Sequence, residues 1–309
     1  MQNAYKHSRD LSNSLREYKD ECGAPPNYIE NEREYHGYHR GLYMYPCDED
    51  EKDRLDIYHH IFLVARGRDR HGRDQLHKVP VADNARILDL GTGTGIWPMQ
   101  MAERYPNAEI WGTDLVNIQP PLIHLNLRFI IPQDFEGPWQ LGDDPWDFIH
   151  FRMGCGSVSK WDVMYEKIFT HLRPGGWLEH IEIDIRPQYE QGANNSRQLD
   201  EWYEYLDGAT QLAEKRLEYP PNLRELMSNC GFVDIDEEVI RLPLNEWPED
   251  EREKFIGRWY NLGLCQGLEA LMLGPLTRAY EWPLENVKQM LMMVKPQICS
   301  RRVRAYHEM

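Results

Sequence analysis

Residues 87–97, ILDLGTGTGIW, bring an acid and three glycines together at the end of an apolar run. Gly91, Gly93 and Gly95 allow a sharp turn and leave room for a ligand, because no Cβ stands in the way. The dinucleotide pattern GxGxxG rests a pyrophosphate on a helix N-terminus, whereas the spacing here is GxGxG. Asp89, two residues before the first glycine, would repel phosphate and attract a cation or an amine. The segment therefore favours a nucleoside that carries a charged amino-acid tail.

Two further acids follow the next two expected strands. Asp114 closes the second strand in EIWGTDL, where a carboxylate can accept both hydroxyls of a ribose. Asp134, in IIPQDFE after the third strand, could reach an adenine amine. Taken singly, each of the three acids could be a helix cap or a turn residue. Together, at three successive strand ends, they predict a nucleoside site.

The elements that must position these residues alternate between strand and helix. Strands are expected at 86–90, 109–114, 127–131, 148–151, 176–185 and 233–242, and helices at 48–66, 96–105, 161–171, 200–215, 223–230 and 249–272. Alternation of this kind predicts an α/β fold with a doubly wound, mostly parallel sheet that is covered on both faces. Ligands of such sheets bind beyond the carboxyl ends of the strands, where the first glycine turn lies.

Several stretches of the chain resemble a known family. ILDLGTGTG, TDL, PQDF, WDFIHFRMGCGSV and LRPGGWLEHIEID resemble the successive motifs of class I S-adenosylmethionine-dependent methyltransferases. YHGYHRGLYMYPCDEDEKDRLDIYH, RMGCGSVSKW and IGRWYNLGLCQGLEALMLGPLTRAY resemble the fungal LaeA-type methyltransferases, which associate with velvet regulators or related membrane-tethering partners. The resemblance covers residues 35–306 and implies a Rossmann-like class I methyltransferase fold with an N-terminal helical cover and helical additions.

The resemblance implies S-adenosylmethionine as the cofactor and assigns residues to it. The glycines lie against its methionine portion, Asp114 takes the ribose, and Asp134 with Phe135 takes the adenine. Arg152 and Met153 border the sulfonium, and aromatic residues of 35–47 fold over the cofactor, although ordinary packing under a helix would explain that cluster equally well. The expected cofactor-binding residues are Tyr35, Tyr38, Tyr43, Asp89, Gly91, Thr92, Gly93, Gly95, Asp114, Leu115, Asp134, Phe135, Arg152 and Met153.

For methyl transfer the protein mainly has to align the acceptor atom with the methyl carbon and exclude water. A general base is needed only where the acceptor carries a proton. The candidates for a catalytic base are His180 and Glu182, in LEHIEIDI, and His36 in the aromatic segment. Each of the three could instead be a buried, paired residue without a chemical role.

Two departures from the family pattern have structural consequences. Pro98 interrupts the helix after the glycine turn, but a proline is tolerated in a first helical turn, whose N–H groups lack intrahelical partners. The chain stops at RRVRAYHEM, where relatives enter the final antiparallel strand of the sheet. We therefore expect that this strand is missing or that the sheet closes differently. A missing strand would leave an edge open for a partner.

Composition narrows the class of protein. The chain has 309 residues, 41% of them hydrophobic, and a formal net charge of −16, so it can bury a full core but is a poor candidate for binding nucleic acid directly. A basic protein acceptor remains compatible with this charge. The scattered cysteines show no zinc-binding spacing, so we expect no metal and free thiols in a reducing compartment. We find neither a signal peptide nor an apolar stretch long enough to insert into a membrane.

These observations lead to one expected organisation and two leading functions. We expect a flexible arm at 1–34, an aromatic and helical cover at 35–80, and the methyltransferase domain with helical insertions at 81–309. The first function is a methyltransferase that acts on a protein within a regulatory complex controlling transcription, development or secondary metabolism, in the nucleus and cytoplasm. The alternative is a regulatory scaffold that binds S-adenosylmethionine but acts through velvet-type or other partners with little turnover. A fold relative that uses the cofactor in another reaction is a third, weaker possibility.

Overall fold

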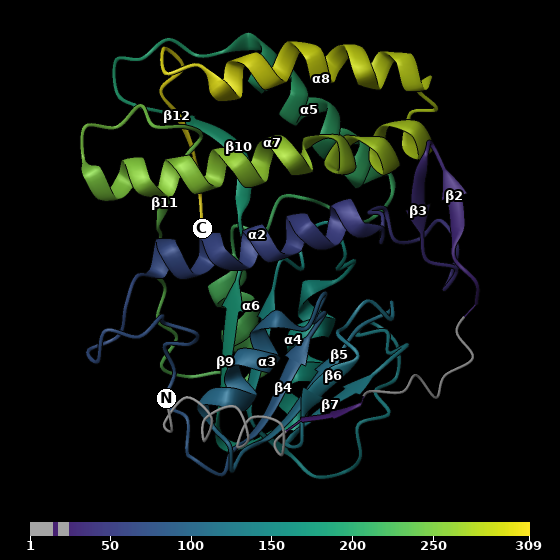
Figure 1. Ribbon diagram of the computed structural model, residues 1–309, viewed down its shortest axis with the longest axis vertical. Helices are drawn as coiled ribbons and strands as arrows, with labels where there is room; N and C mark the ends of the chain where they lie inside the picture. Colours follow the sequence, from purple (N-terminus) through teal and green to yellow (C-terminus); the bar gives the residue numbers. More distant parts are fainter. Residues whose placement is uncertain (1–14, 18–24) are drawn as a thin grey trace, which may run out of the picture. The chain divides into compact units, whose positions relative to one another are not determined.

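The computed structural model describes residues 15–17 and 25–309, which divide into two compact units (Figure 1). The first unit contains residues 76–151 and 170–180 together with the strand at 15–17. The second unit contains residues 26–75, 152–169 and 181–309. Both units are therefore assembled from stretches that are separated along the chain.

A five-stranded sheet forms the centre of the first unit, in the order β7-β5-β4-β8-β9. Its strands are β4 (Arg86–Leu90), β5 (Glu109–Thr113), β7 (Leu127–Ile130), β8 (Trp146–Arg152) and β9 (Leu172–Ile181). The pairs β4–β5, β4–β8 and β5–β7 are parallel, as the strand and helix alternation predicts. The strand order reverses at β4, so the carboxyl end of β4 is the switch point at which doubly wound sheets bind ligands.

Short elements flank this sheet. The helix α3 (Ile96–Arg104) packs against β5, β7 and β6 (Leu122–His124), and β1 (Leu15–Glu17) pairs antiparallel with β6. Pro98 is the third residue of α3, and the backbone N–H of Met99 still donates to the carbonyl of Gly95 at 3.0 Å. The proline is therefore accommodated in the first turn, as expected.

Helices dominate the second unit, and α7 (Glu251–Ala279) is its central element. It packs against α2 (Glu49–Arg66), α5 (Arg197–Leu212) and α8 (Leu284–Cys299), and Figure 1 shows α2 and α8 running alongside it. Close approach of α2 depends on glycine, because a Cβ on Gly263 would lie 2.7 Å from the Cδ1 atom of Ile61. The smaller helices are α4 (Trp161–His171) and α6 (Leu223–Cys230), which match the helices expected at 161–171 and 223–230.

The second unit also contains a three-stranded antiparallel sheet that corrects two expectations. Its order is β10 (Asp184–Tyr189), β12 (Ala305–Glu308) and β11 (Arg241–Pro243). Of the two alternatives for the end of the chain, a missing strand is wrong, because residues 305–308 form an antiparallel strand in the middle of this sheet. The strand lies outside the five-stranded sheet, which fits the other alternative, a sheet that closes differently. The strand expected at 233–242 is also wrong over most of its length, since only its last two residues lie in β11.

The N-terminal expectation falls partly outside the described residues, which omit 1–14 and 18–24. Within the expected arm, β2 (Tyr28–Glu30) pairs antiparallel with β3 (Arg33–Tyr35). This hairpin crosses the domain boundary expected at residue 34. In the part of the chain that the structure describes, no helix combines the length and apolar character needed to span a membrane.

Candidate cofactor site

The turn after β4 has the backbone conformation that the glycine spacing predicts. Gly91, Gly93 and Gly95 have φ angles of 65°, 58° and 77°, a region that is strained for residues with a Cβ. The N–H of Gly95 donates to the carbonyl of Thr92 at 3.0 Å, and α3 begins at the next residue. A Cβ on Gly95 would lie 2.6 Å from the ring of Phe129, so this position admits glycine alone without a shift.

Asp89, the residue before the last of β4, fixes this turn through its carboxylate. The residue is 2% exposed, and both of its carboxylate oxygens make polar contacts. One accepts from the Thr92 hydroxyl at 2.6 Å, and the other lies 2.7 Å from Nδ1 of His150. Asp89 is expected from its position in the motif to act on the ligand by its charge, whereas both of its oxygens contact protein groups that fix the turn. Thr92, 4% exposed, is likewise a structural member of the turn.

Sequence reasoning missed the residues that brace this arrangement. His150 lies opposite Asp89 in the parallel register of β4 and β8, and its ring stacks on Trp97 with centroids 3.7 Å apart. Gln119 donates from Nε2 to the carbonyl of Gly93 at 2.6 Å and to that of Val116 at 3.1 Å. A histidine inside the otherwise apolar run FIHF was the available signal, because a buried polar side chain needs a partner.

Asp114 occupies the position expected for a ribose-binding acid. One carboxylate oxygen accepts from the Gly93 N–H at 2.6 Å, and the other accepts from the N–H groups of Leu115 at 2.7 Å and Val116 at 3.2 Å. Burial raises the pKa of Asp114 to about 6, although these backbone donors oppose the rise. The residue as a whole is partly exposed, and its three N–H donors leave the ionised carboxylate with lone pairs for further donors.

The segment after β7 lies close to the glycine turn. Asp134 accepts from the N–H of Glu136 at 2.8 Å, which makes it a turn residue as well as a candidate adenine contact. Phe135 meets the ring of Phe151 edge-on, and a Cβ on Gly91 would lie 3.6 Å from the Phe135 ring. The first unit thus brings the glycine turn, a carboxylate and an aromatic ring together at the carboxyl edge of the sheet.

The last residue of β8, Arg152, and the loop after it belong to the second unit. Arg152 lies 3.1 Å from Nδ1 of His59 and places its guanidinium over the ring of Phe62, while Met153 adopts a positive φ of 56°. Glu182, in the break between β9 and β10, accepts from the N–H groups of Gly154 at 2.6 Å and Cys155 at 3.2 Å. Glu182 therefore holds the loop after β8.

The two histidine candidates differ in their surroundings. His180, in the first unit, stacks on Phe151 with centroids 5.3 Å apart and an angle of 14°. His36, in the second unit, is 5% exposed, and neither ring nitrogen has a hydrogen-bond partner among the described residues. Burial and then the charge of Arg278 lower the pKa of His36 to about 4, so its imidazole is neutral at pH 7. Neither ring is placed as an obvious general base.

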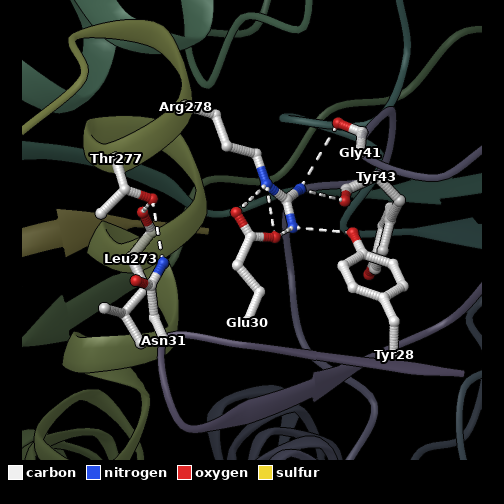
Figure 2. A network of polar contacts seen from close by, with 8 residues as sticks. All are labelled: Tyr28, Glu30, Asn31, Gly41, Tyr43, Leu273, Thr277 and Arg278. Atoms are coloured by element: carbon white, nitrogen blue, oxygen red, sulfur yellow. Dashed lines mark hydrogen bonds and ion pairs between the residues drawn. The ribbon is translucent and has the colours of Figure 1, made fainter.

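The aromatic segment is tied to α7 by one arginine (Figure 2). Figure 2 shows the Arg278 guanidinium facing Glu30, Tyr28 and the backbone carbonyls of 41 and 43. It donates to a Glu30 carboxylate oxygen at 2.7 Å, to the Tyr28 hydroxyl at 3.1 Å and to the Tyr43 carbonyl at 2.8 Å. Its charge also lies over the Tyr35 ring at 4.6 Å. This network fixes the start of the expected cover within the second unit.

The three expected cover tyrosines are not equivalent. Tyr35 is 1% exposed and stacks on Tyr28, so it is a packing residue of the second unit. Tyr43 meets His36 at a centroid distance of 5.3 Å, and Tyr38 meets His39 edge-on at 4.3 Å. Both keep part of their surface exposed. Tyr38 and Tyr43 are therefore the members of the cluster that remain open to a ligand.

The first unit fits a nucleoside with a charged amino-acid tail. The three glycines of the turn present no side chains of their own, and the Asp114 carboxylate has lone pairs beyond those that its three backbone donors use, which suits ribose hydroxyls. Phe135 offers an aromatic face beside the turn. Among residues 15–17 and 25–309, no group of three or more His, Cys, Asp or Glu side chains could hold a metal ion.

Comparison with known proteins identifies the family. The family described as Methyltransferase domain matches residues 64–237. Secondary metabolism regulator LAE1 of Cochliobolus heterostrophus is 53% identical over 288 residues, which cover 91% of this chain and 92% of that protein. Secondary metabolism regulator laeA of Aspergillus niger is 45% identical over 92% of this chain and 76% of its own length. Protein-methionine methyltransferase laeA of Emericella nidulans is 44% identical over 90% of this chain and 73% of its own length.

Solved structures resemble the chain more remotely. A phosphoethanolamine N-methyltransferase of Haemonchus contortus in complex with S-adenosylhomocysteine shares 16% identity, over 74% of this chain and 48% of its own. Its TM-score of 0.40 is too low to support a conclusion about function. The sequence relatives and the matched domain are decisive: the chain belongs to the LaeA family of secondary metabolism regulators, and it is a class I methyltransferase whose cofactor is S-adenosylmethionine.

Proposed function

We propose that the chain methylates a protein acceptor, and that the acceptor atom is the thioether sulfur of a methionine. The observation that carries this proposal is the 44% identity, over 281 residues, to the Emericella nidulans protein named a protein-methionine methyltransferase. The printed name describes that relative. We extend its acceptor chemistry to this chain because the alignment covers 90% of it.

The side chains of the site are compatible with an acceptor that has no proton to lose. A thioether sulfur attacks with a lone pair, so no general base is required, unlike for an amine or a hydroxyl. The carboxylate of Glu182 is engaged by two backbone N–H groups, and the low pKa of His36 makes it a weak base. Bound S-adenosylmethionine supplies an activated methyl group on its sulfonium. The protein then contributes alignment and exclusion of water.

We assign the cofactor contacts as follows. Asp114 accepts the ribose hydroxyls, the glycine turn approaches the methionine portion, and Asp134 with Phe135 borders the adenine. Three hydrogen bonds from backbone N–H groups hold the Asp114 carboxylate in a fixed orientation, which supports its assignment.

The regulatory setting is also part of the proposal. The relatives are named regulators of secondary metabolism, so we propose that the chain works with regulatory proteins, of which velvet-type or related tethering proteins are the candidates. We propose the nucleus and cytoplasm as its location. The net charge of −16 favours a basic segment around the acceptor methionine.

The test is methyl transfer from S-adenosylmethionine carrying a deuterated methyl group. The full chain is incubated alone and with candidate partner proteins, and mass spectrometry then locates the added methyl group. We expect label on methionine in a protein, formed together with S-adenosylhomocysteine and lost in Asp114→Ala. Label confined to lysine, arginine or a carboxylate would refute the thioether assignment.

A binding titration separates turnover from a scaffold role. Calorimetry with S-adenosylmethionine and S-adenosylhomocysteine is performed on the same preparation. Cofactor binding without methyl transfer to any protein, whether partners are present or absent, would favour the hypothesis of a regulatory scaffold over that of an active methyltransferase. Absence of binding by a folded chain would refute the cofactor site itself.

A further inference from the structure

Two cysteines on different helices meet in the second unit. Cys265 lies in the middle of α7, and Cys299 is the last residue of α8. Their Sγ atoms are 3.5 Å apart, which is van der Waals contact between two sulfurs that are not bonded. A disulfide has an S–S distance of about 2.0 Å, so closure requires a sulfur movement of roughly 1.5 Å.

The local structure holds these thiols together. Asn261 lies one turn before Cys265 on α7, and its Nδ2 donates to the carbonyls of Leu244 at 2.7 Å and Ile298 at 3.1 Å. This anchors the end of α8 against α7 and turns Oδ1 of Asn261 toward the sulfurs. Each Sγ atom lies 4.0 Å from that oxygen. The pair is thus positioned by the same residue that fixes the two helices.

The surroundings of the pair do not make a metal site. The two sulfurs contact each other, each of them also contacts an amide oxygen, and the charge of Lys295 acts on Cys265 as well. No group of three His, Cys, Asp or Glu residues that could hold a metal occurs in the part of the chain that is described. Tetrahedral zinc requires four ligands, of which this place supplies two thiolates. Oxidation is the chemistry that two adjacent thiols can perform without further ligands.

The two thiols differ in their access to solvent. Cys299 is exposed at the end of α8, and Cys265 is half-buried. Burial, followed by the neighbouring Cys299, raises the pKa of Cys265 to about 12. Because thiolates are the nucleophiles, the exposed Cys299 is the thiol that meets a dissolved oxidant first. Cys265 is then placed to react with the oxidised sulfur.

We propose that Cys265 and Cys299 form a redox-sensitive pair that hydrogen peroxide converts into an intrachain disulfide between α7 and α8. The Cys299 thiolate attacks one peroxide oxygen, the O–O bond breaks, and a sulfenic acid and hydroxide form. The Cys265 sulfur attacks the sulfenic sulfur, the S–O bond breaks, and the hydroxyl leaves as water with the Cys265 proton. Two thiols are oxidised by two electrons and one peroxide becomes two waters, while a dithiol reductant reverses the reaction.

The disulfide would close a loop that contains residues 266–298. This loop includes the end of α7, with the Arg278 network that binds the N-terminal hairpin, and most of α8. Cross-linking a loop of this length restricts the unfolded chain and raises its thermal stability. The proposal is independent of the methyl acceptor, since neither cysteine belongs to the cofactor site.

The test uses the full-length chain under reducing and oxidising conditions. The reduced protein is treated with hydrogen peroxide, free thiols are blocked by alkylation, and digested peptides are analysed by mass spectrometry. We expect a linked peptide pair that contains Cys265 and Cys299. Its mass should be 2 Da below the summed masses of the two reduced peptides, and dithiothreitol should separate the pair. Oxidation should raise Tm by about 5 °C.

Variants assign the order of events. Cys265→Ser should leave a sulfenic acid on Cys299 that dimedone traps, and Cys299→Ser should leave Cys265 reduced. Cys230→Ser, at a partly exposed cysteine on α6, is the matched control and should form the linked pair normally. Oxidation of Cys299 while Cys265 stays reduced in the unmodified chain, or an intermolecular disulfide as the main product, would overturn the proposal. This readout on the unmodified chain does not depend on the folding of any variant.

Discussion

Protonation of Asp114 should weaken cofactor binding below neutral pH. The pKa of this carboxyl is raised by burial to about 6 in the free protein, and ribose hydroxyls donate to the ionised form. If only that form binds, the apparent Kd is multiplied by one plus the ratio of protonated to ionised carboxyl. Roughly a tenth of the carboxyl is ionised at pH 5, so Kd should rise about tenfold between pH 7.5 and pH 5.

The assay is calorimetric titration with S-adenosylhomocysteine across this pH range. Asp114→Asn keeps the side-chain shape but has one acceptor oxygen, so its Kd should be weakened at pH 7.5 and should not follow the same titration. The loss of a charged acceptor should cost about 1.5 to 3 kcal/mol, or roughly 10- to 150-fold in Kd. Asp134→Asn is the matched control, because it leaves Asp114 unchanged and should retain the tenfold slope.

Folding stability should respond to Asp114 with the opposite sign. Its pKa in the folded chain lies above the unfolded value of 3.8, so its contribution favours folding below that value and is lost as pH rises through about 6. As the pH rises from 4 to 6, cofactor affinity should therefore increase while the contribution of Asp114 to the free energy of unfolding decreases. A Kd that stays constant from pH 7.5 to 5, or that keeps its slope in Asp114→Asn, would refute the ribose assignment.

Other predictions test the turn, the cover and the core. Gly95→Ala should lose cofactor affinity in the same titration, because its φ of 77° and the Phe129 ring both oppose a Cβ; unchanged affinity would contradict this. Deletion of 35–47 should lower affinity, and normal binding would show that the segment only packs. Arg278→Lys should make the N-terminal hairpin sensitive to limited proteolysis, since lysine cannot make the several directed contacts of the guanidinium; equal protection would show that the Arg278 network does not hold the hairpin. Glu51→Ala should lower the free energy of unfolding in urea by about 3 to 5 kcal/mol, because the buried guanidinium of Arg54 would lose its carboxylate partner. A decrease below about 1 kcal/mol would contradict that reasoning.

Much of the first unit could be predicted from the sequence, because its signals are local. An apolar run that ends in an acid and glycines defines both β4 and its turn. The start of the helix at 96 is likewise correct to the residue, as are both ends of the helix at 223–230 in the second unit. Asp114 lies where the motif places it, at the end of β5. These positions are decided by backbone conformation and strand order, which short motifs encode.

Other features depend on contacts between distant segments. β12 is set by pairing with residues more than 60 positions earlier in the chain, which periodicity does not reveal. The role of Asp89 depends on His150, a partner 61 residues away that only the strand register brings beside it. The engagement of Glu182 by backbone N–H groups is equally non-local. In each case the residue type was visible in the sequence, but its partner was not.

The central position of β12 has a consequence for synthesis in the cell. The second unit draws on residues 26–75, yet its sheet lacks a middle strand until residues 305–308 have left the ribosome. At about 5 to 20 residues per second, the early segments wait roughly 15 to 60 s for that strand. The first unit needs nothing beyond residue 180, so it can fold during translation while the second unit folds afterwards. Nascent chains of this protein would thus expose the apolar face of α2 to chaperones for most of their synthesis.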